Sequence, residues 1–232
     1  MLTFAEEILL LSLDDKKGSF LSSVPEQALR TALAGALLME LAVMNRIDTD
    51  LHALFVVAPD PTPDPTPDTT PDTTGDPLLD DVLQRIQTGE ADQPAAFWLN
   101  EIAWKIDNLR DCVVQGLVEK GVLKIEDRKV LWVFPQRRYP LLDDREVKEV
   151  RARLRELLFG NDIPEYRDAV LVGLVHSCGM VETLFSDQEL SQVMPRLTRL
   201  AQLDLIGREV DRAIREIMMA MTAHNIRGVG FY

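Results

Sequence analysis

The sequence predicts a mainly α protein, built as a single-domain helical bundle with small β-hairpins. About ten segments show helical spacing of apolar residues, whereas the strand-like runs are short and bounded by turn residues. The chain has 232 residues, of which 46% are hydrophobic. That is enough to bury one large core, so we expect one domain over residues 2–223.

The N-terminal part is expected to form two helices followed by a strand pair. A capping-box pattern at Thr3 predicts a first helix that runs through Leu13. A second, longer helix begins after Ser23, with a proline in its first turn, and ends near Arg46. The segment 47–58 is short and partly β-branched and aromatic, which favours a small strand pair.

The segment 59–77 interrupts this pattern. It holds seven of the 13 prolines, repeats aspartate at every fourth position over much of its length and contains no basic residue. Because proline removes backbone donors and nothing here can form a core, we expect a flexible, solvated loop within the domain. A ligand for another module, or a modified threonine tract, is the alternative interpretation.

The remainder is expected to be helical apart from one hairpin. Gly121 should end the helix before it, because glycine tolerates a left-handed helix exit. The runs 122–125 and 130–134, separated by four polar residues, predict the hairpin. The stretch 169–175 is apolar on every side and should be the central buried helix. The helices are expected at 78–86, 95–105, 106–120, 143–159, 164–185, 187–203 and 207–222.

Composition limits the partners and the compartment. The net charge of −13 disfavours broad binding to polyanions. Cys112 and Cys178 lie in apolar helical segments, which predicts two buried thiols and a reducing, cytoplasmic compartment. The N-terminal residues do not resemble an export signal, and the apolar runs are too short or interrupted for a membrane-spanning helix.

No catalytic, metal or cofactor motif is recognisable. The three histidines, His52, His176 and His224, have no metal-ligand spacing, and neither a phosphate-binding glycine loop nor a nucleophile motif is present. We therefore expect a protein that is not an enzyme and that holds no metal or cofactor.

Positive charge is concentrated between Lys120 and Arg155. This window has eleven basic and six acidic residues, a charge of +5, which leaves −18 for the rest of the chain. Aromatic residues, including Trp132, Phe134 and Tyr139, are interleaved with the bases, a pattern that an anionic membrane surface selects. The alternative is that the aromatic side chains face the core and the bases form ordinary ion pairs with Glu146, Glu149 and Glu156.

Five segments occur in a fixed order along the chain: 2–11 (LTFAEEILLL), 38–42 (LMELA), 75–80 (GDPLLD), 117–123 (LVEKGVL) and 174–176 (LVH). In this order they resemble the Golgi phosphoprotein 3 family over nearly the whole chain. The resemblance implies a helical domain that lies peripherally on membranes. In eukaryotic members of the family, such a domain binds phosphatidylinositol 4-phosphate on Golgi membranes and holds the cytosolic tails of glycosyltransferases.

The resemblance also implies candidate site residues. Of four positions in the family's lipid pocket, Arg110 is retained, whereas the others fall on Pro25, Ala34 and Asp107. Arg30 lies one helical turn before Ala34 and is expected either to reach the same space or to be a solvated surface arginine. For Arg110, the alternative to a headgroup contact is an ion pair with Asp107. Membrane contact or self-association is expected at the hairpin residues Arg128, Lys129, Leu131, Trp132, Phe134, Arg137 and Arg138.

These residues lead to three hypotheses. The first is a peripheral membrane adaptor that binds anionic lipid headgroups reversibly, on the cytosolic face of the Golgi if the source is eukaryotic, with membrane-protein tails and a second copy of the chain as partners. The second is a soluble scaffold that self-associates through the hairpin at 124–134 without binding lipid. The third is a nucleic-acid binder, which the net negative charge disfavours.

Overall fold

A computed structural model describes residues 1–50, 53–57, 73–130 and 134–200, together with residues 212, 214, 215 and 219. Within these residues the chain forms nine named helices and three two-stranded antiparallel sheets. The predicted mainly α class with small hairpins is therefore confirmed.

Two helices form the centre of the molecule: α1 (Phe4–Leu11) and α2 (Glu26–Val43). All eight residues of α1 are buried, and fourteen of the eighteen in α2 are buried. The predicted capping box is present, since the Thr3 side chain accepts from the Glu6 amide and the Glu6 carboxylate accepts from the Thr3 amide. This local pairing fixes where the most buried helix begins.

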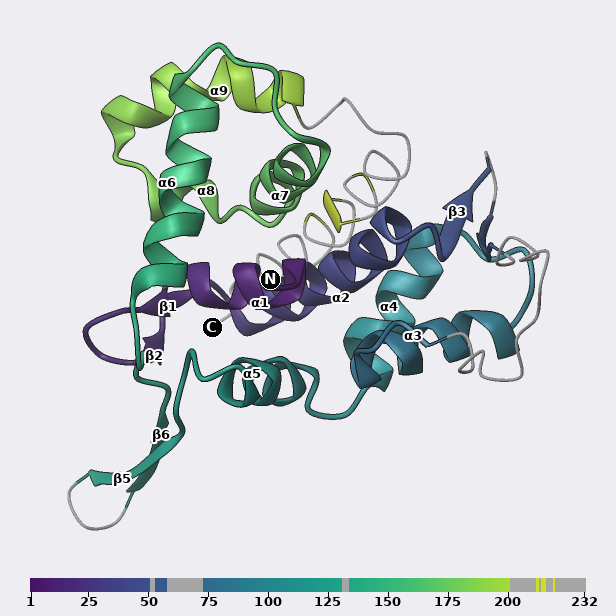
Figure 1. Ribbon diagram of the computed structural model, residues 1–232, viewed down its shortest axis with the longest axis horizontal. Helices are drawn as coiled ribbons and strands as arrows, with labels where there is room; N and C mark the ends of the chain where they lie inside the picture. The colour runs from purple at the N-terminus through teal and green to yellow at the C-terminus, as the bar shows by residue number, and fades with distance from the viewer. Residues whose placement is uncertain are drawn as a thin grey trace, which may run out of the picture.

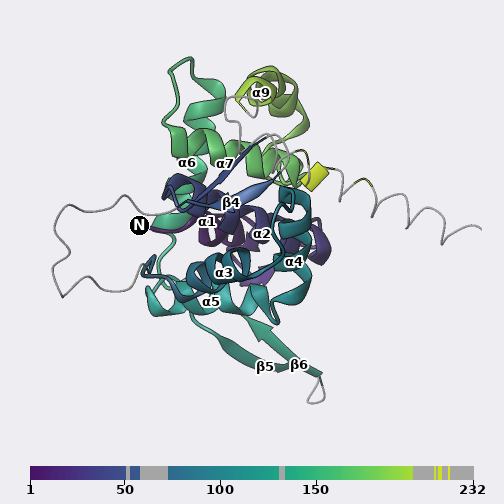
Figure 2. The same ribbon diagram turned by 90° about the vertical axis from the view of Figure 1, so that its right-hand side faces the viewer.

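The other helices cover this central pair from two sides (Figures 1 and 2). On one side lie α3 (Pro77–Thr88), α4 (Ala95–Lys105) and α5 (Leu109–Glu119). On the other side lie α6 (Arg145–Phe159), α7 (Tyr166–Ser177), α8 (Val181–Leu184) and α9 (Asp187–Leu200).

The strands are short and lie at the connections between helices. The expected strand pair within 47–58 is confirmed, and the pair β1–β2 was not predicted because its strands have two residues each. The third pair, β5–β6, is an arm that extends away from the helices (Figure 2). The strands are β1 (Leu13–Asp14), β2 (Ser19–Phe20), β3 (Ile47–Thr49), β4 (Leu54–Val56), β5 (Glu126–Val130) and β6 (Phe134–Arg138).

The position predicted for the last hairpin is wrong by about four residues. The polar segment expected to be its turn forms β5, and the arginines expected beyond its second strand lie in β6. Of the apolar run 122–125, Val122 and Leu123 are buried, and Leu123 forms an isolated bridge with Leu141. An arm that stands away from the core needs no apolar face, so apolar spacing does not mark its strands.

Residues with a positive φ angle mark helix boundaries that the apolar periodicity of the sequence did not reveal. Asn108 has φ 53°, so α5 begins at Leu109 instead of residue 106. Gly179 has φ 65° and divides the segment expected to be one helix into α7 and α8. The predicted stop at Gly121, φ 71°, is confirmed. Most of the helix expected at 207–222 lies outside the described residues.

Two expectations about burial need correction. Cys178 is buried but Cys112 is exposed, and the two form no disulfide. Tyr139, expected among the membrane-facing aromatic residues, is buried with its ring 5.3 Å from that of Phe20. The stretch 169–175 is buried as expected, but it belongs to α7, which covers one side of the central pair α1 and α2.

The end of the proline-rich tract forms the N-terminal cap of α3. The Asp76 carboxylate accepts from the Leu78 and Leu79 amides, and the Thr74 amide donates to Asp80 at 2.6 Å. Residues 59–72, where the flexible loop is expected, lie outside the described residues.

Candidate functional site

Arg110 lies in the first turn of α5 and contacts two carboxylates. Its Nη1 is 3.4 Å from the Glu26 Oε1, its Nε is 3.7 Å from the Asp111 Oδ1, and its guanidinium lies over the Phe20 ring at 4.9 Å. The strongest charge-assisted hydrogen bonds are about 2.7–2.9 Å long, so both contacts are loose. The predicted alternative, a pair with Asp107, is not among its contacts in the described chain.

Arg30 joins two helices. Its Nε donates to the Ala103 carbonyl at 2.7 Å and its Nη2 to the Ile106 carbonyl at 3.2 Å. The guanidinium also lies 5.4 Å from the ring centroid of Trp104, which is 44% exposed. Since the last carbonyls of a helix lack internal partners, Arg30 caps the C-terminal end of α4.

The fold brings the two predicted headgroup residues to one corner of the molecule. Arg30 reaches the connection between α4 and α5, and Arg110 follows directly after that connection. Glu26, which contacts Arg110, lies one turn before Arg30 on α2. Ala34, the position that Arg30 was expected to replace, is fully buried.

The hairpin residues are described in part. In β6, Arg137 contacts Asp111 at 3.7 Å and Asp127 at 3.5 Å, and the Arg138 Nη1 donates to the Lys17 carbonyl at 3.0 Å. Leu131 and Trp132 lie outside the described residues, as do the side chains of Arg128, Lys129 and Phe134. Contact of the hairpin with a membrane or a second chain stays a prediction.

The basic residues of α6 are engaged in ion pairs. This agrees with the alternative interpretation of the basic window, although most partners are acids other than those expected. Because exposed pairs neutralise each other locally, α6 is not a broad cationic face. The pairs are Arg145 with Asp143 and Glu146, Lys148 with Asp144, Arg151 with Asp15, Arg153 with Glu7 and Asp168, and Arg155 with Glu189.

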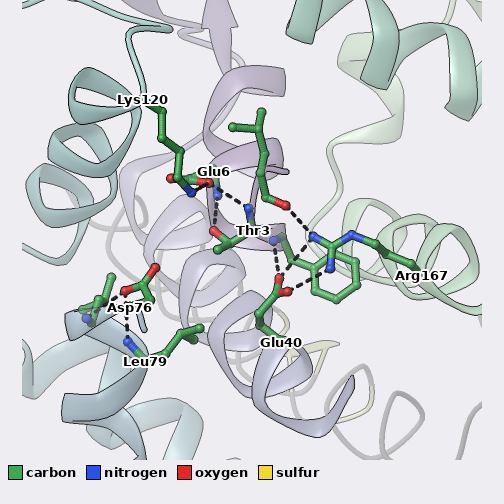
Figure 3. A network of polar contacts seen from close by, with 10 residues as sticks. Thr3, Glu6, Glu40, Asp76, Leu79, Lys120 and Arg167 are labelled. Carbon is green, nitrogen blue, oxygen red and sulfur yellow. Dashed lines mark hydrogen bonds and ion pairs between the residues drawn. The ribbon is translucent and has the colours of Figure 1, made fainter. Parts of the chain in front are cut away.

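A buried charge network, which sequence reasoning did not find, holds the start of α1 (Figure 3). The Glu40 carboxylate accepts from the Phe4 amide at 2.6 Å and from the Arg167 Nη1 at 2.8 Å. Arg167 also donates to the Leu2 carbonyl at 2.7 Å. Acids within apolar helical runs were the available signal, because a buried carboxylate requires a partner.

Two acidic residues of α1, Glu6 and Glu7, are also buried and form ion pairs. The Glu6 carboxylate lies 2.7 Å from the Lys120 Nζ, and the Glu7 Oε1 accepts from the Arg153 Nη2 at 2.9 Å. Burial raises the pKa of Glu7 above its usual value, while the neighbouring Arg153 acts in the opposite direction. These pairs tie α1 to the end of α5 and to α6.

A cavity of about 900 Å³ lies between α1, α2, α3 and α5, and Arg110 is not among the residues that line it. Its lining is mainly apolar, with Cys112 and the carboxylates of Asp81, Asp111 and Glu119 among the lining residues. The described residues contain no group of three or more potential ligands placed to hold a metal ion. None of the helices described is both long and apolar enough to cross a bilayer.

The chain is similar to known proteins over most of its length. The sequence profile described as Golgi phosphoprotein 3 (GPP34) matches residues 4–217. The vacuolar protein sorting-associated protein 74 of Eremothecium gossypii is 29% identical over 175 residues, which cover 70% of this chain. Because the match covers 50% of the relative, the chain spans about half the length of that protein. The profile accounts for nearly all of the fold described above, and the chain therefore belongs to the Golgi phosphoprotein 3 family.

Proposed function

We propose that this chain is a non-enzymatic peripheral membrane adaptor that binds anionic lipid headgroups at the corner formed by Arg30 and Arg110. Membership of the Golgi phosphoprotein 3 family supports this role. Phosphatidylinositol 4-phosphate is the lipid that the family resemblance suggests. Cytosolic tails of membrane proteins are the proposed cargo, and the cytosolic face of the Golgi is the proposed location in a eukaryotic source.

The observation that carries the proposal is that Arg110 is partly exposed and only loosely paired with carboxylates. Its side chain is 30% exposed, and its two carboxylate contacts are 3.4 and 3.7 Å long. Among the described residues it forms no hydrogen bond that an incoming phosphate would have to break. Arg153 and Arg167, in contrast, donate to buried carboxylates at 2.9 and 2.8 Å.

Arg30 has a different part in the proposed site. Its Nε and Nη2 donate to carbonyls of α4 and of the residue after it. We propose that it contributes positive potential and holds Trp104 at the surface, while Arg110 contacts the headgroup. Trp side chains favour the headgroup level of a bilayer, where an apolar ring and a polar N–H are both accommodated.

Co-sedimentation with liposomes tests the proposal. The vesicles contain phosphatidylcholine alone, or with phosphatidylserine, or with phosphatidylinositol 4-phosphate, over a series of salt concentrations. Charge-assisted hydrogen bonds contribute about 1.5–3 kcal/mol, so Arg110→Ala is expected to weaken binding to the anionic vesicles at least tenfold.

Arg199→Ala is the matched control, because it removes the same charge from an exposed position on α9, at the opposite end of the molecule from the hairpin. Its binding should stay within twofold of the wild type. Failure of the wild-type protein to bind any vesicle, or equal losses in the two variants, would contradict the headgroup site.

A soluble scaffold that self-associates through the hairpin is the second candidate. One observation favours it: β5 and β6 form a sheet of two strands that stands away from the helices, so each strand has an outer edge unpaired within the described chain. Such edges can pair with a second chain. Sedimentation velocity at increasing protein concentration distinguishes this candidate, which predicts dimers or larger species and no lipid dependence.

A further inference from the structure

The Asp111 carboxylate lies between two guanidinium groups from different parts of the fold. Its Oδ1 is 3.7 Å from the Arg110 Nε, and its Oδ2 is 3.7 Å from the Arg137 Nη1. Arg110 belongs to α5, whereas Arg137 belongs to β6 in the hairpin arm. One carboxylate is therefore shared by the predicted headgroup arginine and by a residue of the arm.

This bridge leaves polar atoms unsatisfied. The Arg110 Nε and the Asp111 Oδ1 are both shielded from solvent and lack a hydrogen-bond partner within the described chain. Two neighbouring ion pairs are shorter, at 2.7 Å for Lys124 with Glu126 and 2.6 Å for Lys148 with Asp144, whereas Arg145 lies 3.7 and 3.4 Å from its two acids. A buried donor without a partner is unfavourable, so the Arg110 side is suited to a larger anion.

We infer that Arg110 and Arg137 together form a binding site for a phosphate monoester, in which the phosphate replaces the Asp111 carboxylate as the shared anion. The inference rests on the proposed function where that phosphate belongs to a lipid headgroup. A phosphate monoester carries about −1.5 to −2 charges and three strong acceptor oxygens. It can therefore accept from both guanidinium groups, whereas the carboxylate remains 3.7 Å from each.

The surroundings permit this exchange. The Asp111 side chain is 39% exposed and can turn toward water when an anion takes its place. The other contact of Arg137, with Asp127, is 3.5 Å long and involves a carboxylate that is 76% exposed. Exposed pairs of this kind contribute little stability, so little is lost when Arg137 turns toward a phosphate.

The inferred site would link the hairpin arm to the headgroup corner. Asp107, at a position where the family resemblance implies an arginine, cannot contact an anion favourably. Arg137 would supply the second positive charge from β6 instead of from α5. Phosphate binding would then hold the base of the arm against α5.

The experiment uses the full chain with Arg110→Ala, Arg137→Ala and the double variant. Binding is measured to vesicles with phosphatidylinositol 4-phosphate and, separately, to inorganic phosphate by following the arginine Nε–H signals in NMR spectra. Each single variant should lose at least tenfold in vesicle affinity. The double variant should lose less than the product of the two losses, because both residues act on one anion.

Two control variants isolate the inferred contacts. Arg145→Ala removes one charge from a 74% exposed side chain at the start of α6, the helix that follows the arm, and should change affinity less than twofold. Asp111→Asn should raise affinity several-fold because it removes the competing carboxylate. Glu119→Gln removes the same charge from an exposed position on the same helix and should have a much smaller effect.

The outcomes distinguish failure of the arginine-pair site from failure of the proposed membrane role. If Arg110→Ala loses vesicle binding but Arg137→Ala behaves like Arg145→Ala, the headgroup site stands and the arginine pair is wrong. If phosphate shifts the Nε–H signals of both arginines but no vesicle is bound, the arginine pair stands and the membrane role is wrong. Absence of binding in both assays overturns both. Urea unfolding of each variant shows whether a loss reflects misfolding.

Discussion

At the scale of single residues, the arginines of this protein divide by the quality of their partners. Arg30, Arg153 and Arg167 donate short hydrogen bonds to carbonyls or carboxylates and connect helices. Arg110 and Arg137 make longer contacts, of 3.4 to 3.7 Å, with one acid each and with Asp111, which they share. The first group is suited to holding the fold, and the second retains donors for a ligand.

Arg30→Ala should lower the free energy of unfolding by about 1.5–3 kcal/mol, because the alanine leaves the carbonyls of Ala103 and Ile106 without their charged donor. Urea unfolding followed by circular dichroism measures the change. Arg199→Ala, from an exposed position, should stay within about 0.5 kcal/mol of the wild type. A loss in Arg30→Ala no larger than in this control would show that the α4 cap is unimportant.

Protonation of Glu189 makes the free energy of unfolding depend on pH in the acid range. Hydrogen bonds from Arg155 and from Ser186 lower the pKa of Glu189 to about 2 from its usual 4.5. Because the pKa is lower in the folded state, the stabilisation is complete above the unfolded pKa and is lost as the pH falls toward 2. Arg155→Ala should therefore reduce the slope of unfolding free energy against pH between pH 4.5 and 2. Identical slopes in the variant and the wild type would contradict this assignment.

At the scale of elements, α1 is fixed by charges from three other parts of the fold. Lys120, which follows α5, and Arg167 of α7 reach Glu6 of α1 and Glu40 of α2 (Figure 3). Arg153 of α6 reaches Glu7 of α1. Since α1 is buried on all sides, these contacts also determine how the two outer groups of helices meet it.

Arg167→Ala should destabilise the protein by about 3–5 kcal/mol, because Glu40 then remains as a buried charge without its cation. Chemical unfolding measures the change. The double variant Glu40→Gln with Arg167→Met should be less damaging than the single variant, since no buried charge is left. If the double variant loses as much as the single one, the effect comes from packing and the charge explanation is wrong.

At the scale of the whole molecule, charge sets which anions can bind. The net charge of −13 opposes long-range attraction to polyanions, and the bases of α6 are already paired. Binding to an anionic surface must therefore depend on a local site, such as the corner at Arg110, and on short-range contacts.

The protein should not retain short duplex DNA in a gel-shift assay at about 150 mM NaCl, because its net charge repels the phosphate backbone. Vesicle binding by the same preparation provides the positive control. Salt-dependent retention of DNA at protein concentrations that bind vesicles would contradict the expectation and revive the nucleic-acid hypothesis.

The sequence by itself determined the features that depend on neighbours within a turn or two. The capping box at Thr3 and the helix stop at Gly121 were predictable because a helix terminus is satisfied by residues close in the chain. The mainly α class followed from apolar periodicity in the same way, and the ordered motifs identified the family.

Only the tertiary structure decided which charges meet. Glu40 and Arg167 are 127 residues apart in the chain, and nothing in the spacing of either predicts the other. The same holds for Asp111, whose position between Arg110 and Arg137 depends on how the arm leaves the body. The position of the hairpin was missed for a related reason, since its two strands pair with each other and extend away from the helices, whose packing therefore imposes no alternating pattern on them. Ion pairs and exposed arms are set by packing between distant segments, which local sequence patterns do not encode.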